Sequence, residues 1–179
     1  MTIAPIILIG ADRRQLGKST LLASIAKELT AAGIDVIGVK IRAPKTGPSG
    51  YFFEERHEVK PSVRNMFEAG CTHVIHIEAD DKDRLPLLRE ALTETGVQLK
   101  EGNTTSGQST HVVLCESNAL RFDLTPALFI HIETPEGEVK ASAKKTKELA
   151  DIRIIEPFTK DDVETIVSRI KEILGVAPA

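Results

Sequence analysis

The chain has 179 residues, of which 41% are hydrophobic and 27% charged, and its formal net charge is −3. This composition is typical of one globular domain, expected over residues 1–179, and it argues against a broad basic surface for nucleic acid. The sequence contains neither an apolar run as long as a membrane span nor a signal-peptide pattern at its N-terminus. Cys71 and Cys115 lie far apart between strand-like residues, so we expect buried, reduced thiols and a cytoplasmic protein.

The first predicted unit is a strand over residues 5–10, a loop, and a helix over residues 17–32. The loop ends in Gly17-Lys18-Ser19-Thr20, which is the second half of a phosphate-binding loop. Such a loop directs backbone N–H groups and a helix N-terminus at phosphates, with Lys18 on the β- and γ-phosphates and Ser19 on Mg²⁺. The predicted nucleotide-binding residues of the loop are Asp12, Arg13, Arg14, Gln15, Leu16, Gly17, Lys18, Ser19 and Thr20.

One position of this loop departs from the usual pattern. Glycine is expected five residues before Gly17, where this chain has Asp12, and Gly10 lies two residues too early. Aspartate tolerates a left-handed backbone better than most residues, so the turn can form if the Asp12 carboxylate points away from the phosphates. The alternative is an ordinary strand–turn–helix junction in which Lys18 is a solvated residue of the first turn.

The second predicted strand, residues 35–41, is followed by a long loop over residues 42–60. Lys40 and Arg42 end this strand, where either can hold a phosphate or a substrate anion, or simply be solvated. The charge run at residues 54–58 is expected to be solvated, with His57 a weak candidate for a base. A short helix over residues 61–69, a strand over residues 72–77 and a helix over residues 82–95 follow.

Residues 101–110 are expected to form a mobile surface loop, because they contain almost no apolar side chain. The next strand, residues 111–115, ends in Glu116. An acidic residue at the tip of a central strand can hold Mg²⁺ or orient a nucleophile. Glu116 is therefore predicted to be catalytic together with Lys18, and to bind the metal together with Ser19. The alternative is that Glu116 caps the following loop.

The last predicted elements are a strand over residues 127–132, a helix over 138–149, a strand over 152–155 and a helix over 160–174. Thr159-Lys160-Asp161-Asp162 matches the Thr-Lys-x-Asp form of a guanine-reading motif, in which Asp162 binds the base. The same residues also suit the start of an amphipathic helix. Glu156 and Pro157 are predicted to contact the base, whichever base is bound.

The alternation of strands and helices predicts a three-layer α/β fold with a mostly parallel sheet and helices on both faces. The chain resembles P-loop NTPases of the signal-recognition and MinD-like class, and most of all MobB-type accessory proteins of molybdopterin-guanine dinucleotide biosynthesis. The resemblance rests on residues 17–22, 33–40 and 62–70 and on Leu114-Cys115-Glu116. The chain departs from the family at Asp12, at Ile41-Arg42-Ala43-Pro44 in place of a histidine-rich stretch, and at Ser117 in place of glycine.

The resemblance implies GTP binding, weak hydrolysis and a homodimer. We therefore expect a Mg²⁺-dependent GTP- or ATP-binding protein with slow NTPase activity, accessory to molybdenum cofactor assembly and possessing a protein partner there. One alternative is a small-molecule kinase or ligase of the same superfamily, similar to dethiobiotin synthetase, with Lys40 and Arg42 holding the acceptor. The other is a non-catalytic nucleotide switch that docks a protein partner.

Overall fold

A central eight-stranded sheet organises the computed structural model, which describes residues 1–57, 60–102 and 109–176. Seven strands follow the order β3-β4-β2-β6-β1-β7-β8, and β5 pairs with the first half of β1. Every pair of neighbours is parallel except β3 and β4, so the expected mostly parallel α/β architecture is confirmed. In chain order the elements are β1 (Thr2–Ala11), α1 (Lys18–Ala31), β2 (Asp35–Arg42), β3 (Gly50–Phe53), α2 (Pro61–Glu68), β4 (His73–Glu78), α3 (Arg84–Glu94), β5 (Val97–Lys100), β6 (His111–Glu116), the 3-10 turn η1 (Ala119–Phe122), β7 (Leu128–Glu133), α4 (Ala141–Thr146), the 3-10 turn η2 (Lys147–Leu149), β8 (Ile152–Ile155) and α5 (Lys160–Leu174).

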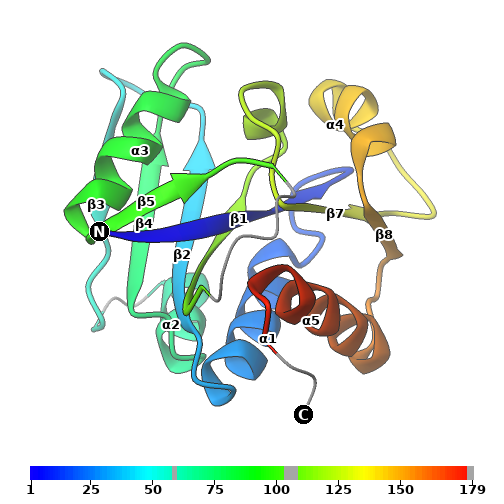
Figure 1. Cartoon of the computed structure of the whole chain (residues 1–179). Helices are drawn as coiled ribbons and strands as arrows, with labels where there is room; N and C mark the ends of the chain where they lie inside the picture. Colours follow the sequence, from blue (N-terminus) through cyan, green and yellow to red (C-terminus); the bar gives the residue numbers. More distant parts are fainter. Residues whose placement is uncertain (58–59, 103–108, 177–179) are drawn as a thin grey trace.

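Helices cover both faces of the sheet (Figure 1): α1, α2 and α5 lie on one side, and α3 and α4 on the other. Each face has its own apolar core. Ile7 and Ile9 of β1 point into the core under α1 and α5, whereas Ile6 and Leu8 point into the core under α3. Because successive strand residues alternate between two buried faces, β1 is apolar along most of its length.

The structure corrects three of the expectations from the sequence: it adds two short strands and shortens one helix. The segment 42–60, expected to be a loop, contains the antiparallel strand β3, and β5 lies where no element was expected. Both strands have only four residues, too few for a clear periodic pattern. The helix expected over residues 138–149 is α4, which ends at Thr146 and continues only as the 3-10 turn η2.

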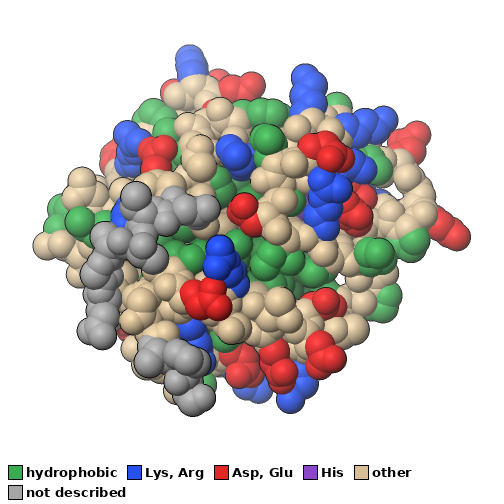
Figure 2. Space-filling view, turned by 45° about the vertical axis from the view of Figure 1, so that its right-hand side comes forward, with side chains coloured by type: hydrophobic (Ala, Val, Ile, Leu, Met, Phe, Trp, Pro, Cys, Tyr) green, Lys and Arg blue, Asp and Glu red, His purple; other side chains and the backbone are tan. Residues whose placement is uncertain are grey.

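Surface and core properties agree with the composition. On the face seen in Figure 2, basic and acidic side chains lie intermixed. Cys71 and Cys115 are both buried, with free thiols. Within the described ranges, no helix has the length and apolarity needed to cross a membrane. Most of the expected mobile loop, residues 103–108, lies outside the described residues.

The parallel strands bring several polar side chains to one edge of the sheet. In the strand register, Glu116 of β6 pairs with Lys40 of β2, Lys40 pairs with His76 of β4, and His76 pairs with Phe52 of β3. Paired residues on neighbouring strands point to the same face, so these side chains form a single row. The row lies on the α1 and α2 side, near the carboxyl ends of the strands, where ligands bind in open α/β sheets.

Candidate functional site: a cationic cavity at the carboxyl edge of the sheet

The loop between β1 and α1 has a backbone suited to binding an anion. Gly17 precedes α1 with φ 79°, and Gln15 also has a positive φ of 62°, a conformation that costs a non-glycine residue about 1–2 kcal/mol. Leu21 N–H donates to Gly17 O at 2.8 Å, which closes the first turn of the helix. Among the described residues, no backbone carbonyl accepts from the N–H groups of residues 13–20. Of these donors, the N–H groups of residues 17–20 lie at the start of α1 beside the cavity and are therefore available to an anion there.

Asp12 anchors this loop to β7 and faces away from the helix start. Its side chain is buried, with Oδ1 3.0 Å from His131 Nε2 and Oδ2 accepting from Thr134 N–H at 3.0 Å. Burial lowers the pKa of His131, against the opposing effect of Asp12. The sequence required this carboxylate to point away from bound phosphates; in the structure it contacts His131 and Thr134 and does not line the cavity.

Gly10 is required by packing beneath the loop. A Cβ atom at this position would lie 2.9 Å from the Phe129 ring and closer still to Asn118 Oδ1. That amide oxygen accepts from Ala11 N–H at 2.8 Å, while Asn118 Nδ2 donates to Ala11 O at 2.8 Å. The glycine that sits too early for the usual motif therefore lets β6 and β7 close against the base of the loop.

A cavity of about 940 Å³ opens in front of the loop, between the starts of α1 and α2 and the ends of β2, β4 and β6. Its volume falls within the range of small-molecule sites. Positive charge predominates on its wall, and among the described lining residues the carboxylates of Glu54 and Glu116 oppose it. The basic side chains are those of Arg14, Lys18, Lys40, Arg42, Lys45, Lys60 and Lys140.

Lys18 experiences this charge directly. Its pKa is lowered chiefly by burial, and the charges of Lys140, Lys40 and Arg14 lower it further, while Glu116 opposes them. A phosphate group would relieve both effects, because it supplies negative charge close to a partly desolvated ammonium. The cavity is thus electrostatically matched to an anion.

Lys40 connects the loop to β6 and α2. Its Nζ donates to Ser19 Oγ at 3.1 Å and to Ser62 Oγ at 3.0 Å, and lies 3.9 Å from Glu116 Oε2. The other oxygen of Glu116, Oε1, is buried and has no hydrogen-bond partner in the described part of the chain. A buried carboxylate oxygen of this kind is an unused acceptor for a cation or a water molecule.

The cavity brings together only some of the site residues that were predicted from the sequence. Its wall includes Arg14, Gln15, Gly17, Lys18, Ser19, Thr20, Lys40, Arg42 and Glu116. Arg42 is also tied to Glu78, with its Nε 2.8 Å from Oε1. The residues that do not line the cavity are Asp12, Arg13, Leu16, Glu156, Pro157 and Asp162.

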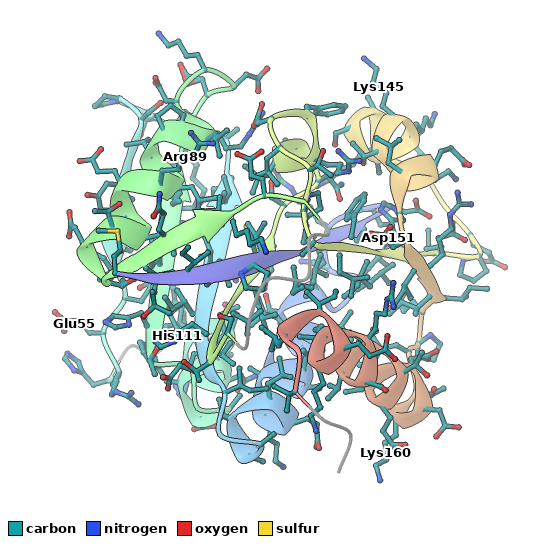
Figure 3. All side chains as sticks on the ribbon, in the orientation of Figure 1. Glu55, Arg89, His111, Lys145, Asp151 and Lys160 are labelled. Atoms are coloured by element: carbon teal, nitrogen blue, oxygen red, sulfur yellow. The ribbon has the colours of Figure 1, made fainter. Side chains whose placement is uncertain are left out.

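Asp162 has a structural role at the start of α5. Its Oδ2 accepts from Thr159 N–H at 2.6 Å, and its own N–H donates to Thr159 Oγ1 at 3.2 Å, forming a capping box. Lys160, next to it, points away from the fold (Figure 3). Residues 159–162 therefore form the start of a helix, as the alternative interpretation expected. Guanine binding by Asp162 stays a prediction.

Several cavity residues were missed from the sequence, above all Glu54 and His76. The charge run containing Glu54 was expected to be solvated, but Glu54 is buried against His76, with Oε1 3.2 Å from Nδ1. His76 stands near the end of a strand, and that position is the only sequence signal that could have identified it. Ser62 and Lys140 also line the cavity, from the start of α2 and from the segment before α4.

Comparison with known proteins adds no further assignment: no family model matches the chain, and no curated protein sequence matches it. The class of protein is therefore described from the geometry of the fold and the cavity alone. The chain is an α/β protein with a mostly parallel sheet and a cationic cavity at the carboxyl edge.

Proposed function

We propose that the cavity binds the phosphates of a nucleoside triphosphate, GTP or ATP, in a Mg²⁺-dependent manner. The observation that carries this proposal is the run of N–H groups over residues 13–20, which have no backbone acceptor and stand at the start of α1 beside Lys18. Backbone donors, the helix N-terminus and a lysine together are the elements of a phosphate site. The resemblance of residues 17–22 to P-loop proteins supports the same assignment.

The donor set at the cavity fits a Mg²⁺ ion carried mainly by the nucleotide. Ser19 Oγ and the unpartnered Glu116 Oε1 would hold it, and Mg²⁺ sites of this kind complete their shell with phosphate oxygens and water. The ion would neutralise charge on the phosphates. Lys40 Nζ now contacts Ser19 Oγ, so its ammonium would remain with Ser62 or turn toward a phosphate.

Slow hydrolysis is the activity that we propose for this site, with Glu116 holding Mg²⁺ or orienting the attacking water. A place in molybdopterin-guanine dinucleotide assembly, a partner protein there and a homodimer rest on the family resemblance. A second candidate, a small-molecule kinase or ligase, is favoured by one specific observation: the cavity extends from Lys18 to Arg42 and His76, beyond the loop itself. A nucleotide switch without turnover remains the non-enzymatic alternative.

Thermal unfolding with and without nucleotide tests the proposal. A ligand at about 100 times its dissociation constant stabilises a fold by roughly 2.7 kcal/mol, or roughly 5–11 °C for a chain of this size. We expect Mg·GTP, Mg·ATP or both to raise the Tm of the parent protein by this amount, and Lys18→Ala to abolish the increase. Slowly hydrolysed analogues should act in the same way.

The control is Lys27→Ala, which removes an exposed lysine from α1 outside the cavity. It should retain the nucleotide-induced increase in Tm. If Lys18→Ala is stabilised as much as the parent, the phosphate site is not at this loop and the proposal fails.

A further inference from the structure

Glu54 and His76 form a buried acid–imidazole pair at the end of the cavity far along the row from Glu116. His76 is only 6% exposed, and its Nδ1 lies 3.2 Å from Glu54 Oε1. Its other ring nitrogen, Nε2, is buried and has no hydrogen-bond partner among the residues that the structure describes. Both residues line the same cavity as Lys18. A carboxylate on Nδ1 fixes the tautomer that leaves Nε2 free to accept a proton.

The register of the sheet relates this pair to the proposed phosphate site. His76, Lys40 and Glu116 stand in one row on three neighbouring strands, with Lys40 in the middle. Two strand spacings separate the backbones of His76 and Glu116 by about 10 Å. Lys40 already reaches Ser19 at the start of α1, so a small molecule beside Lys40 would have the γ-phosphate on one side and His76 on the other.

We propose that this end of the cavity is an acceptor subsite, in which His76, oriented by Glu54, takes the proton from a hydroxyl that attacks the γ-phosphoryl group. The inference rests on the proposed function, which supplies the nucleotide. The acceptor oxygen forms a bond to the γ-phosphorus, and the bond from that phosphorus to the β–γ bridging oxygen breaks. The hydroxyl proton passes to His76 Nε2, and the nucleoside diphosphate leaves with the bridging oxygen.

The charges around His76 indicate what kind of hydroxyl compound fits. Arg42 and Lys40 face it from β2, Lys60 from the start of α2, and Glu54 from the segment after β3. Lys45 adds a further positive charge to the cavity wall. The acceptor is therefore a small hydroxyl compound that carries its own negative charge. Burial is the main cause that lowers the pKa of His76, so the imidazole is neutral at pH 7 and can accept a proton.

Water, the smallest hydroxyl nucleophile, serves as the probe. Single-turnover phosphate release from Mg·GTP and Mg·ATP is measured over pH 5–8, and binding of slowly hydrolysed analogues is measured separately. His76→Asn keeps an amide near Glu54 but removes the basic nitrogen, so release should slow about 10²-fold while analogue binding stays close to that of the parent. The parent rate should fall at acid pH as His76 is protonated, and His76→Asn should lack this acid limb.

His73→Asn is the matched control, because His73 lies on the same strand, is exposed and does not line the cavity. It should keep the parent rate and pH profile. Glu54→Gln should slow release by less than His76→Asn, and it carries the test if His76→Asn does not fold. The inference would be overturned if His76→Asn released phosphate at the parent rate and with the parent's fall in rate at acid pH. If His76→Asn does not fold, the same result in Glu54→Gln would overturn it.

Two further outcomes separate this inference from the proposed function. A parent protein that binds neither nucleotide contradicts the proposed function itself. A parent protein that binds nucleotide but releases no phosphate to water contradicts both the role of His76 and the proposed slow hydrolysis, and it leaves the phosphate site standing.

Discussion

At the scale of single residues, Glu116 has an unusual environment for a carboxylate. It is 7% exposed, only Lys40 approaches it as an ion-pair partner among the described residues, and Oε1 has no hydrogen-bond partner. A purely structural cap would use its oxygens on backbone N–H groups, and here Leu120 N–H is instead accepted by Ser117 Oγ at 3.1 Å. The environment of Glu116 thus favours a role toward ligand over a role in capping the loop.

Glu116→Gln should lower turnover about 10²-fold, because it keeps the size of the side chain but removes the charge that orients water or Mg²⁺. Nucleotide affinity should change far less, since Lys18 and the loop N–H groups make the phosphate contacts. Single-turnover phosphate release and analogue binding separate the two effects. Glu133→Gln, at the end of β7 and outside the cavity, is the control. Hydrolysis at the parent rate by Glu116→Gln would assign Glu116 to structure.

The cavity-lining residues that the sequence could identify are those that stand in a local pattern. Lys18 and Ser19 belong to a contiguous motif, and Lys40 and Glu116 each stand near the end of an apolar strand. Glu54 could not be identified, because its burial depends on β3 folding back against β4. Charge runs are usually solvated, and the pairing that buries Glu54 is a long-range contact.

At the scale of secondary-structure elements, the start of α5 is fixed by its capping box rather than by contact with the cavity. Asp162→Ala should reduce the free energy of unfolding by about 1 kcal/mol and lower the Tm by roughly 2–4 °C. Asp161→Ala, which changes a neighbouring acid of the first turn outside the box, should cost less. If Asp162→Ala instead weakens GTP selectively and leaves the Tm unchanged, Asp162 reads the base and its capping role is minor.

Long elements with a strong apolar pattern were predictable, and short ones were not. The expected helices over 17–32 and 160–174 correspond to α1 and α5, whose buried residues recur at helical spacing. The four-residue strands β3 and β5 are held by pairing with β4 and β1, which no local pattern reveals. No local pattern reveals either that α4 ends at Thr146, before the end of the expected helix.

At the scale of the whole molecule, strand order decides which residues meet. Strands β4, β2, β6 and β1 are neighbours in space although they are separated in the chain, so side chains of β4, β2 and β6 share one cavity with the loop that follows β1. The sequence predicted the parallel sheet and the edge that carries the site. It did not predict that β4 lies next to β2, which is what places His76 beside Lys40.

The central claim is that nucleotide phosphates bind at the loop between β1 and α1, and mapping of backbone amides by ¹⁵N NMR tests it most directly. Adding a slowly hydrolysed GTP or ATP analogue with Mg²⁺ should shift the amides of residues 13–20 most, because these N–H groups have no backbone acceptor in the described structure. Smaller shifts are expected at Lys40 and Glu116. Unchanged amides over residues 13–20, or the largest shifts around Asp151 and Arg169 at the β8–α5 groove, would contradict it.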